Sequence, residues 1–150
     1  MLHTILGITC YDPYFRDALF ENSTAAVRDS YFVSEHDSVL LKAISKDRSL
    51  KSAFEEVGNK ICTHKPCPSV APEVLSVIGA ALLDESFRKE FFKDPIATAR
   101  KHGLVLRYPE TYVLATLMDG QNGERLKKAI TDLADRLPRL TEKAEVLTAA

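Results

Sequence analysis

The chain has 150 residues, of which 45% are hydrophobic and 27% are charged, and its formal net charge is −1. This length fits one ordinary domain that can bury enough surface to fold without disulfides or metal. The near-zero charge excludes a broad basic face for nucleic acid, and no apolar run reaches the about 20 residues that cross a bilayer. We therefore expect a globular protein whose partners are neither nucleic acid nor membrane.

The beginning of the chain, MLHTILGITCYD, has no basic segment and no small-residue cleavage site. It is therefore not expected to be a signal peptide. The three cysteines are an odd number, which argues against a disulfide framework and favours a reducing, cytoplasmic location.

The first 61 residues are predicted to form several short helices separated by capping residues. Asp12, followed by a proline, caps an aromatic helix that runs to about residue 21, and Asn22 or Ser23 caps the next helix. Ser34 opens a further helix, and Asp47 caps the helix that ends near residue 61. No convincing alternation of apolar and polar residues indicates a strand, so the fold is predicted to be all-α.

A linker with three prolines follows at residues 62–72. A mostly apolar helix then leads to Asp84, which is predicted to cap a second aromatic helix, and Asp94-Pro95 begins a short helix that ends at Gly103. The sequence DGQNG, at 119–123, is read as a turn. An amphipathic helix follows to Leu137, and residues 138–150 are read as a tail.

The second aromatic stretch repeats the first at a distance of 72 residues. The matching positions are those that cap helices or carry apolar side chains, which favours a tandem duplication over two unrelated amphipathic stretches that share a register. We therefore predict a compact multi-helix bundle of two tandem, pseudo-twofold-related helical repeats that share one core. The repeats are 1–61 and 73–137, and the phenylalanines of both are expected to pack at the joint between them.

Four arginines recur in pairs across the two repeats, as Arg16 with Arg88 and Arg28 with Arg100. They are read either as partners of nearby carboxylates or as a site for an anion or a partner protein. The aromatic helices supply a second kind of candidate contact, and Phe87 and Phe91 are its named residues.

The linker sequence CTHKPC places Cys62, His64 and Cys67 close together. Thiolate and imidazole are ligands that zinc prefers, but no second local pair completes a site. A proline-bearing linker with thiols, or a disulfide between Cys62 and Cys67, is the alternative. His102 precedes a helix-ending glycine, where a cation interacts favourably with the helix dipole. No catalytic residue and no resident cofactor are predicted.

The pattern F-R-x-x-F-x-x-D-P followed by G-L, from Phe87 to Leu104, resembles a small helical module of two families. One is the alpha subunit of protocatechuate 4,5-dioxygenase-type extradiol enzymes, and the other is the nitrile-hydratase-alpha-like leader region of peptide precursors. This resemblance implies a module that covers or binds a partner protein and carries little chemistry of its own. The first repeat lacks the Asp-Pro and Gly-Leu signatures, and the nitrile hydratase cysteine cluster is absent.

These observations favour a non-catalytic helical protein that binds another protein, as an adaptor or an accessory subunit of a larger bacterial complex. A small subunit above the active site of a ring-cleaving dioxygenase is one alternative. A small-molecule or metal-cofactor binding protein, with an apolar pocket at the joint, is another. Self-association into a homo-oligomer is also open.

Overall fold

A computed structural model describes residues 2–28, 31, 33–62 and 69–138. All ten elements found in these ranges are α-helices, which confirms the all-α prediction. The helices, in chain order, are α1 (Leu2–Tyr11), α2 (Pro13–Glu21), α3 (Ser23–Arg28), α4 (Glu35–Lys46), α5 (Ser49–Ile61), α6 (Pro72–Leu83), α7 (Glu85–Lys93), α8 (Pro95–Lys101), α9 (Tyr108–Leu117) and α10 (Gly120–Arg136).

The two halves of the chain, α1–α5 and α6–α10, have matching helix boundaries. Adding 72 to the bounds of α2 gives the bounds of α7, and α1, α3, α4 and α5 match α6, α8, α9 and α10 to within a few residues. The caps match as well: Asp12 accepts from the backbone N–H groups of Tyr14 and Phe15, and Asp84 accepts from that of Phe87. Such a cap satisfies the free amides of the first helical turn, which is why both helices begin at the same point of the pattern.

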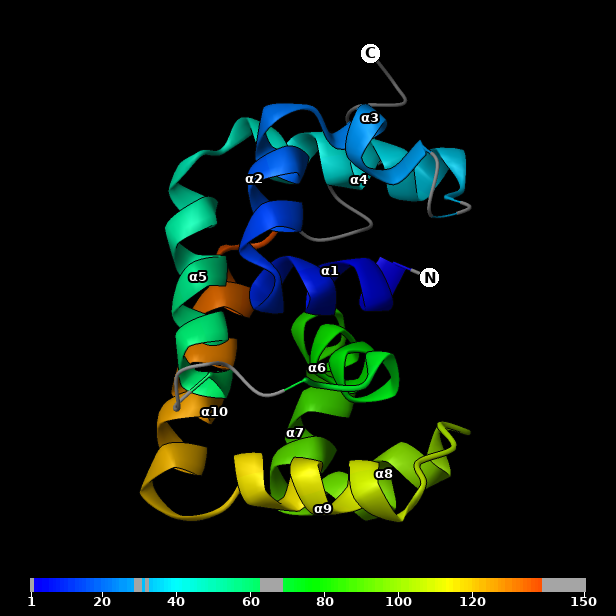
Figure 1. The fold of residues 1–150 in the computed structure, drawn as a ribbon, viewed down its shortest axis with the longest axis vertical. Helices are drawn as coiled ribbons and strands as arrows, with labels where there is room; N and C mark the ends of the chain where they lie inside the picture. The colour runs from blue at the N-terminus through cyan, green and yellow to red at the C-terminus, as the bar shows by residue number, and fades with distance from the viewer. Residues whose placement is uncertain (1, 29–30, 32, 63–68, 139–150) are drawn as a thin grey trace.

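The helices α1 and α6 form the most extensive contact in the molecule and lie at its centre (Figure 1). Their contact is reciprocal. A Cβ atom on Gly7 would collide with the carbonyl of Leu75, and a Cβ on Gly79 would collide with the carbonyl of His3, which stands 72 residues before Leu75. Glycine at both positions therefore lets the two backbones approach closely. Reciprocal contacts are typical of a twofold axis; the pseudo-twofold repeat stays a prediction that they favour.

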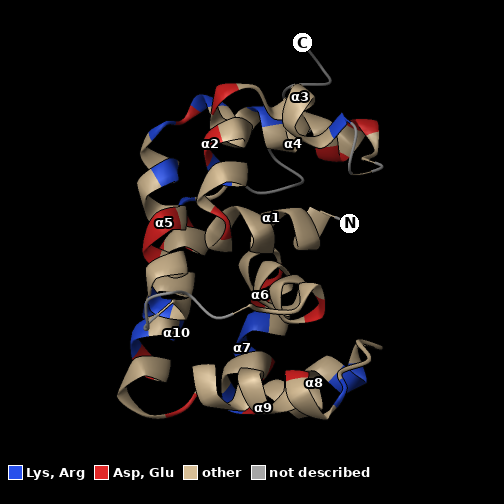
Figure 2. Cartoon of the chain, viewed as in Figure 1, with Lys and Arg blue, Asp and Glu red and all other residues tan. Residues whose placement is uncertain are grey.

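The remaining helices lie around this central pair. In Figure 1, α5 and α10 run side by side along one edge, α2–α4 lie at one end and α7–α9 at the other. The ring contacts of the described aromatics each stay within one half, such as Phe20 with Phe54 and Phe87 with Phe91. Among the described aromatics, no ring–ring contact thus crosses from one half to the other, and packing of the phenylalanines at the joint stays a prediction. The apolar helices α1 and α6, of which only α6 carries a charged residue, form the most extensive contact between the halves (Figure 2).

The predicted turn at 119–123 is also wrong, because α10 begins at Gly120. Within residues 119–123, only Gly120 has the positive φ of a turn residue, at 63°. Gly123 lies within the helix, where a Cβ atom would collide with the backbone of Met118. The glycines therefore allow a tight passage from α9 into α10. The amphipathic pattern that follows is confirmed, since Leu126, Ile130 and Leu133 are buried.

Candidate protein-binding surface

The exposed face of α9 carries large apolar side chains. Tyr108 and Tyr112 are 83% and 65% exposed, and Val105, just before the helix, is 82% exposed. The two tyrosines are four residues apart and so lie on one face of the helix. Single exposed apolar residues are ordinary on a protein surface, whereas a group of them marks a candidate interaction site. We call these three residues the α9 patch.

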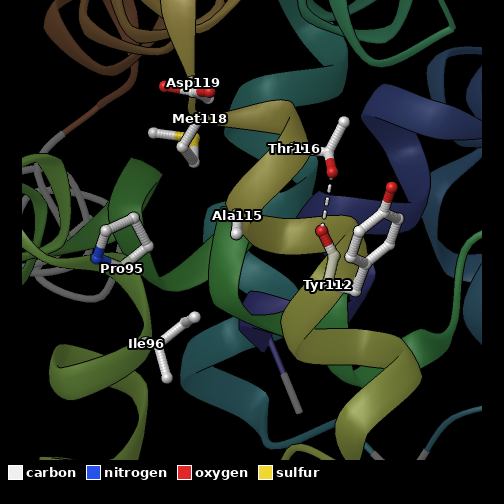
Figure 3. A pocket seen from close by; sticks show the side chains of 7 residues that line it. All are labelled: Pro95, Ile96, Tyr112, Ala115, Thr116, Met118 and Asp119. Carbon is white, nitrogen blue, oxygen red and sulfur yellow. Dashed lines mark hydrogen bonds between the residues drawn. The ribbon is translucent and has the colours of Figure 1, made fainter.

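A hollow of about 370 Å³ lies between α8 and α9, next to the patch (Figure 3). Pro95 and Ile96 of α8 form one wall, and Tyr112 of the patch belongs to the opposite wall. The Thr116 hydroxyl donates to the carbonyl of Tyr112 at 2.9 Å, so its polar group is satisfied within the helix. The hollow therefore has an apolar character, and the remaining lining residues are Ala115, Thr116, Met118 and Asp119.

Comparison with α4, the matching helix of the first half, shows that the α9 face is uncovered. Leu40 and Ile44 stand 72 residues before Tyr112 and Thr116, and they are 1% and 0% exposed. In the first half, α4 contacts α2, α3 and α5. In the second half, Leu114 of α9 and Met118 directly after the helix are buried instead, and α9 contacts α6, α8 and α10. The two helices therefore bury different faces, and the face that α4 hides is left exposed on α9.

A buried carboxylate anchors the beginning of α9. Glu110 is 4% exposed, and its Oε1 accepts from Arg107 Nε at 3.1 Å and lies 3.0 Å from Arg107 Nη2. A hydrogen bond to its own backbone N–H and the Arg107 guanidinium lower the pKa of Glu110, against the opposing effect of burial. The ionised carboxylate thus stabilises the N-terminal turn that presents the tyrosines.

The four arginines that the sequence singled out are not brought together. Arg16 is 8% exposed, and its Nη1 donates to the carbonyls of Thr9 at 3.2 Å and Cys10 at 2.8 Å, at the end of α1. Arg88 donates in the same way to Ala81 at 2.9 Å, and residue 81 is the 72-residue match of residue 9. Arg28 and Arg100 are exposed near the ends of their helices. Binding of an anion or a partner by these arginines stays a prediction.

Both named phenylalanines lie in the core. Phe87 is 4% exposed and Phe91 is 0% exposed, and their rings stack with centroids 5.9 Å apart. The imidazole of His102 and the ring of Phe87 form a T-shaped pair, with ring centroids 4.9 Å apart. The Nε2 atom of His102 is 3.3 Å from a carboxylate oxygen of Glu90, as expected for a hydrogen-bonded or paired imidazole.

The proposed zinc ligands fall partly outside the described residues. His64 and Cys67 lie outside the described residues, and Cys62 is disulfide-bonded. The remaining cysteine, Cys10, is free and fully buried, and this burial raises its thiol pKa well above its usual range. Within the described ranges no group of three His, Cys, Asp or Glu side chains could hold a metal ion. Zinc binding by Cys62, His64 and Cys67 would require reduction of the disulfide at Cys62, because zinc binds the thiolate, and it stays a prediction.

Sequence reasoning missed the α9 patch. The available signal was the pair of tyrosines at a spacing of four, together with Val105, in a segment whose apolar residues fall on both faces of the helix. Such a pattern predicts that some apolar side chains stay exposed.

The fold and the surface define an all-helical protein with an uncovered apolar helix face. Compared with curated proteins, the chain is 32% identical over 133 residues to the septation ring formation regulator EzrA of Listeria innocua, and 31% identical to that of Listeria monocytogenes. Each alignment covers 85% of this chain and 21% of the relative. The chain thus spans about a fifth of the length of the curated relatives it matches. No protein-family model and no solved structure matches it.

These comparisons overturn the resemblance drawn from Phe87–Leu104. The septation regulators match over most of the chain, and no support emerges for similarity to extradiol dioxygenase subunits or to nitrile-hydratase-like leader regions. The physical reason is that the quoted motif consists of caps and buried rings: Asp84 and Asp94 cap helices, and Phe91 is core. Many helical proteins need such residues at such spacings, so the motif does not specify a family.

No helix in the described part of the chain is both long and apolar enough to span a bilayer.

Proposed function

We propose that this chain is a non-catalytic helical module that binds another protein within a bacterial assembly, and that the α9 patch is its contact surface. The observation that carries the proposal is the exposed face of α9, whose counterpart on α4 is buried. Similarity to septation ring regulators supports a place in a multi-protein assembly. A net charge of −1 favours a protein partner over nucleic acid.

The partner element that fits this surface is an amphipathic helix. In the first half, α4 contacts α2, α3 and α5, and its Leu40 and Ile44 are buried, so this chain already covers such a face with its own helices. A partner helix would place an apolar side chain in the hollow beside α9 and others on Tyr108 and Tyr112. Helix-in-groove docking of this kind uses anchors three and four residues apart.

The cellular context that we propose is cell division. The relatives are named for regulating formation of the septation ring, and we extend this context to the present chain. A cytoplasmic location and self-association belong to the same proposal. The tandem repeat is part of it as well, because the matching helix bounds of the two halves support a duplication.

The test is the position of a fluorescent fusion of the full chain in dividing cells of its own organism. We expect the fusion to gather at the division site. The double variant Tyr108→Ser/Tyr112→Ser should become diffuse, whereas Tyr14→Ser should still gather there. Tyr14 is a matched control because it is 85% exposed on α2, at the opposite end of the molecule from α9.

Two outcomes would contradict separate parts of the proposal. Diffuse fluorescence of the unchanged fusion would contradict the division context. Normal gathering of the double variant would contradict the α9 patch as the contact surface. Circular dichroism of each purified variant is the control for folding. We expect the helices to be retained, because exposed substitutions change the free energy of unfolding by only about 0.5 kcal/mol.

A further inference from the structure

A second hollow, of about 280 Å³, lies where the first half of the chain meets the second. His3 reaches it from α1, and the aromatic floor is Phe87 of α7. Its other lining residues are Ala80, Leu83, Asp84, His102 and Leu104. The volume is just below the range of about 300–1,000 Å³ that is typical of ligand pockets. It therefore suits a ligand with a single ring.

The first half carries bulkier side chains at the matching positions. Ile8 and Tyr11 stand 72 residues before Ala80 and Leu83, and both pack against the core. Exchanging isoleucine for alanine and tyrosine for leucine removes several atoms from one wall. The hollow in the second half is thus located where the repeat pattern has lost side-chain volume.

The first half also shows which side chain packs against the phenylalanine that matches Phe87. Tyr31 packs edge-on against Phe15, with ring centroids 5.9 Å apart and an interplanar angle of 76°. Phe15 is the match of Phe87, and the match of Tyr31 is Gly103, which has no ring to offer. A Cβ atom on Gly103 would meet no atom within 4 Å. Besides the stacked ring of Phe91, the chain thus supplies the smaller imidazole of His102 to Phe87, where the first half supplies the phenol ring of Tyr31 to Phe15.

The polar surroundings repeat as well. Burial and then the charge of Asp12 raise the pKa of Tyr31, so the phenol of Tyr31 lies within electrostatic reach of that carboxylate. Asp84, the match of Asp12, lines the hollow. His3 of α1 also lines the hollow, and its match in the second half is Leu75. Burial lowers the pKa of His3, which favours a neutral imidazole whose free nitrogen can accept a hydrogen bond from a hydroxyl group.

We propose that the hollow between His3 and Phe87 binds one phenol ring, either of a free small molecule or of a tyrosine side chain. The ring lies against Phe87 and between Leu83 and Leu104, and the hydroxyl group donates to His3 or Asp84. His3 is partly buried, so a ligand that lacks the hydroxyl would leave its imidazole without a hydrogen-bond partner and should bind more weakly. This inference goes beyond the adaptor role and does not depend on it.

The test is a titration of the full chain with 4-methylphenol, the side-chain analogue of tyrosine, followed by amide NMR shifts. We expect saturable shifts at Leu83, Phe87, His102 and Leu104. Toluene, which has the same shape without the hydroxyl, should bind at least about tenfold more weakly. Absence of shifts at these amides, or equal binding of toluene, would overturn the proposal.

Three variants make the test specific. Ala80→Ile and Leu83→Tyr each restore the side chain of the first half, and each should weaken 4-methylphenol at least about tenfold. Should one of them fail to fold, the other still reports on the wall. His3→Leu, which introduces the side chain of the matching Leu75, should bring 4-methylphenol down to the affinity of toluene. Unchanged binding in a folded wall variant would show that the ligand lies elsewhere.

The source of the ring is distinguished with a blocked peptide, acetyl-Gly-Tyr-Gly-amide. If the peptide shifts the same amides, the ring belongs to a tyrosine of a partner protein. If only the free 4-methylphenol does so, the ligand is a small phenolic molecule. Either result supports the site. The α9 double variant should bind 4-methylphenol normally, so failure of this proposal leaves the adaptor proposal untouched.

Discussion

The Thr4 and Ser76 hydroxyl groups share a hydrogen bond of 2.7 Å, although the two residues are 72 positions apart in the chain. This separation equals the offset between matching helices of the two halves. Residues that are related by a twofold axis meet each other only close to that axis. The bond thus marks the place in the α1–α6 contact where an axis would pass.

The close approach at this contact predicts that neither glycine tolerates a methyl group. Gly7→Ala and Gly79→Ala should each lower the free energy of unfolding by about 2–3 kcal/mol, because backbone atoms, not flexible side chains, occupy the space. Urea unfolding followed by circular dichroism measures this. Ser86→Ala, on the exposed face of α7, is the control and should change the value by less than about 0.5 kcal/mol. Equal effects of all three substitutions would contradict the contact.

Burial of Phe91 predicts a large loss of stability on truncation. The ring is 0% exposed and lies between those of Phe87 and Phe92. Phe91→Ala should therefore cost about 3–5 kcal/mol, as removal of large buried rings does. Phe92 is only partly buried, so Phe92→Ala is the matched control and should cost less. A loss below about 1 kcal/mol for Phe91→Ala would place the ring at the surface.

The buried guanidinium of Arg16 is predicted to stabilise the end of α1. Arg16→Met keeps much of the side-chain volume but removes the donor to the Thr9 and Cys10 carbonyls. We expect a loss of about 1–3 kcal/mol, the penalty for leaving buried acceptors unpaired. Thermal and urea unfolding would detect it.

Two comparisons make the Arg16 result interpretable. Arg88→Met should cost less, since Arg88 is only half-buried and donates to the single carbonyl of Ala81. Arg28→Met, at an exposed position, should be nearly neutral. If Arg16→Met left stability unchanged, the guanidinium would be free for the anion or partner role that the sequence suggested.

His3 is predicted to make stability depend on pH. Burial lowers its pKa in the folded state below the 6.5 of an unperturbed histidine. The unfolded chain then binds more protons as the pH falls below 6.5, so the free energy of unfolding should decrease from about pH 7 towards pH 5. We call this dependence of the unfolding free energy on pH the slope. In His3→Leu the part of the slope that His3 contributes should be lost.

The measurement is urea unfolding at several pH values across that window. His36→Leu, at an exposed position of α4, should keep the slope of the unchanged protein. A slope that is the same in both variants and in the unchanged protein would assign it to other groups.

Local signals in the sequence determined where most helices begin and end. Asp12, Ser34, Asp84 and Asp94 were expected as caps, and each accepts a backbone N–H of the first helical turn. Gly103 was expected in the left-handed region and has a φ of 77°. These features follow from hydrogen bonds and sterics within a few residues, which is why the sequence by itself reveals them.

Only the tertiary structure decided which helix faces are covered. Leu40 and Tyr112 stand at matching positions of two matching helices, yet one is buried and the other exposed. The same holds for the joint, where α1 and α6 make their central contact through glycine backbones. Burial depends on which distant helix arrives at a face and on how closely two backbones can approach, and neither is encoded within one helical segment. The α9 patch and the hollow beside Phe87 both arise at this level.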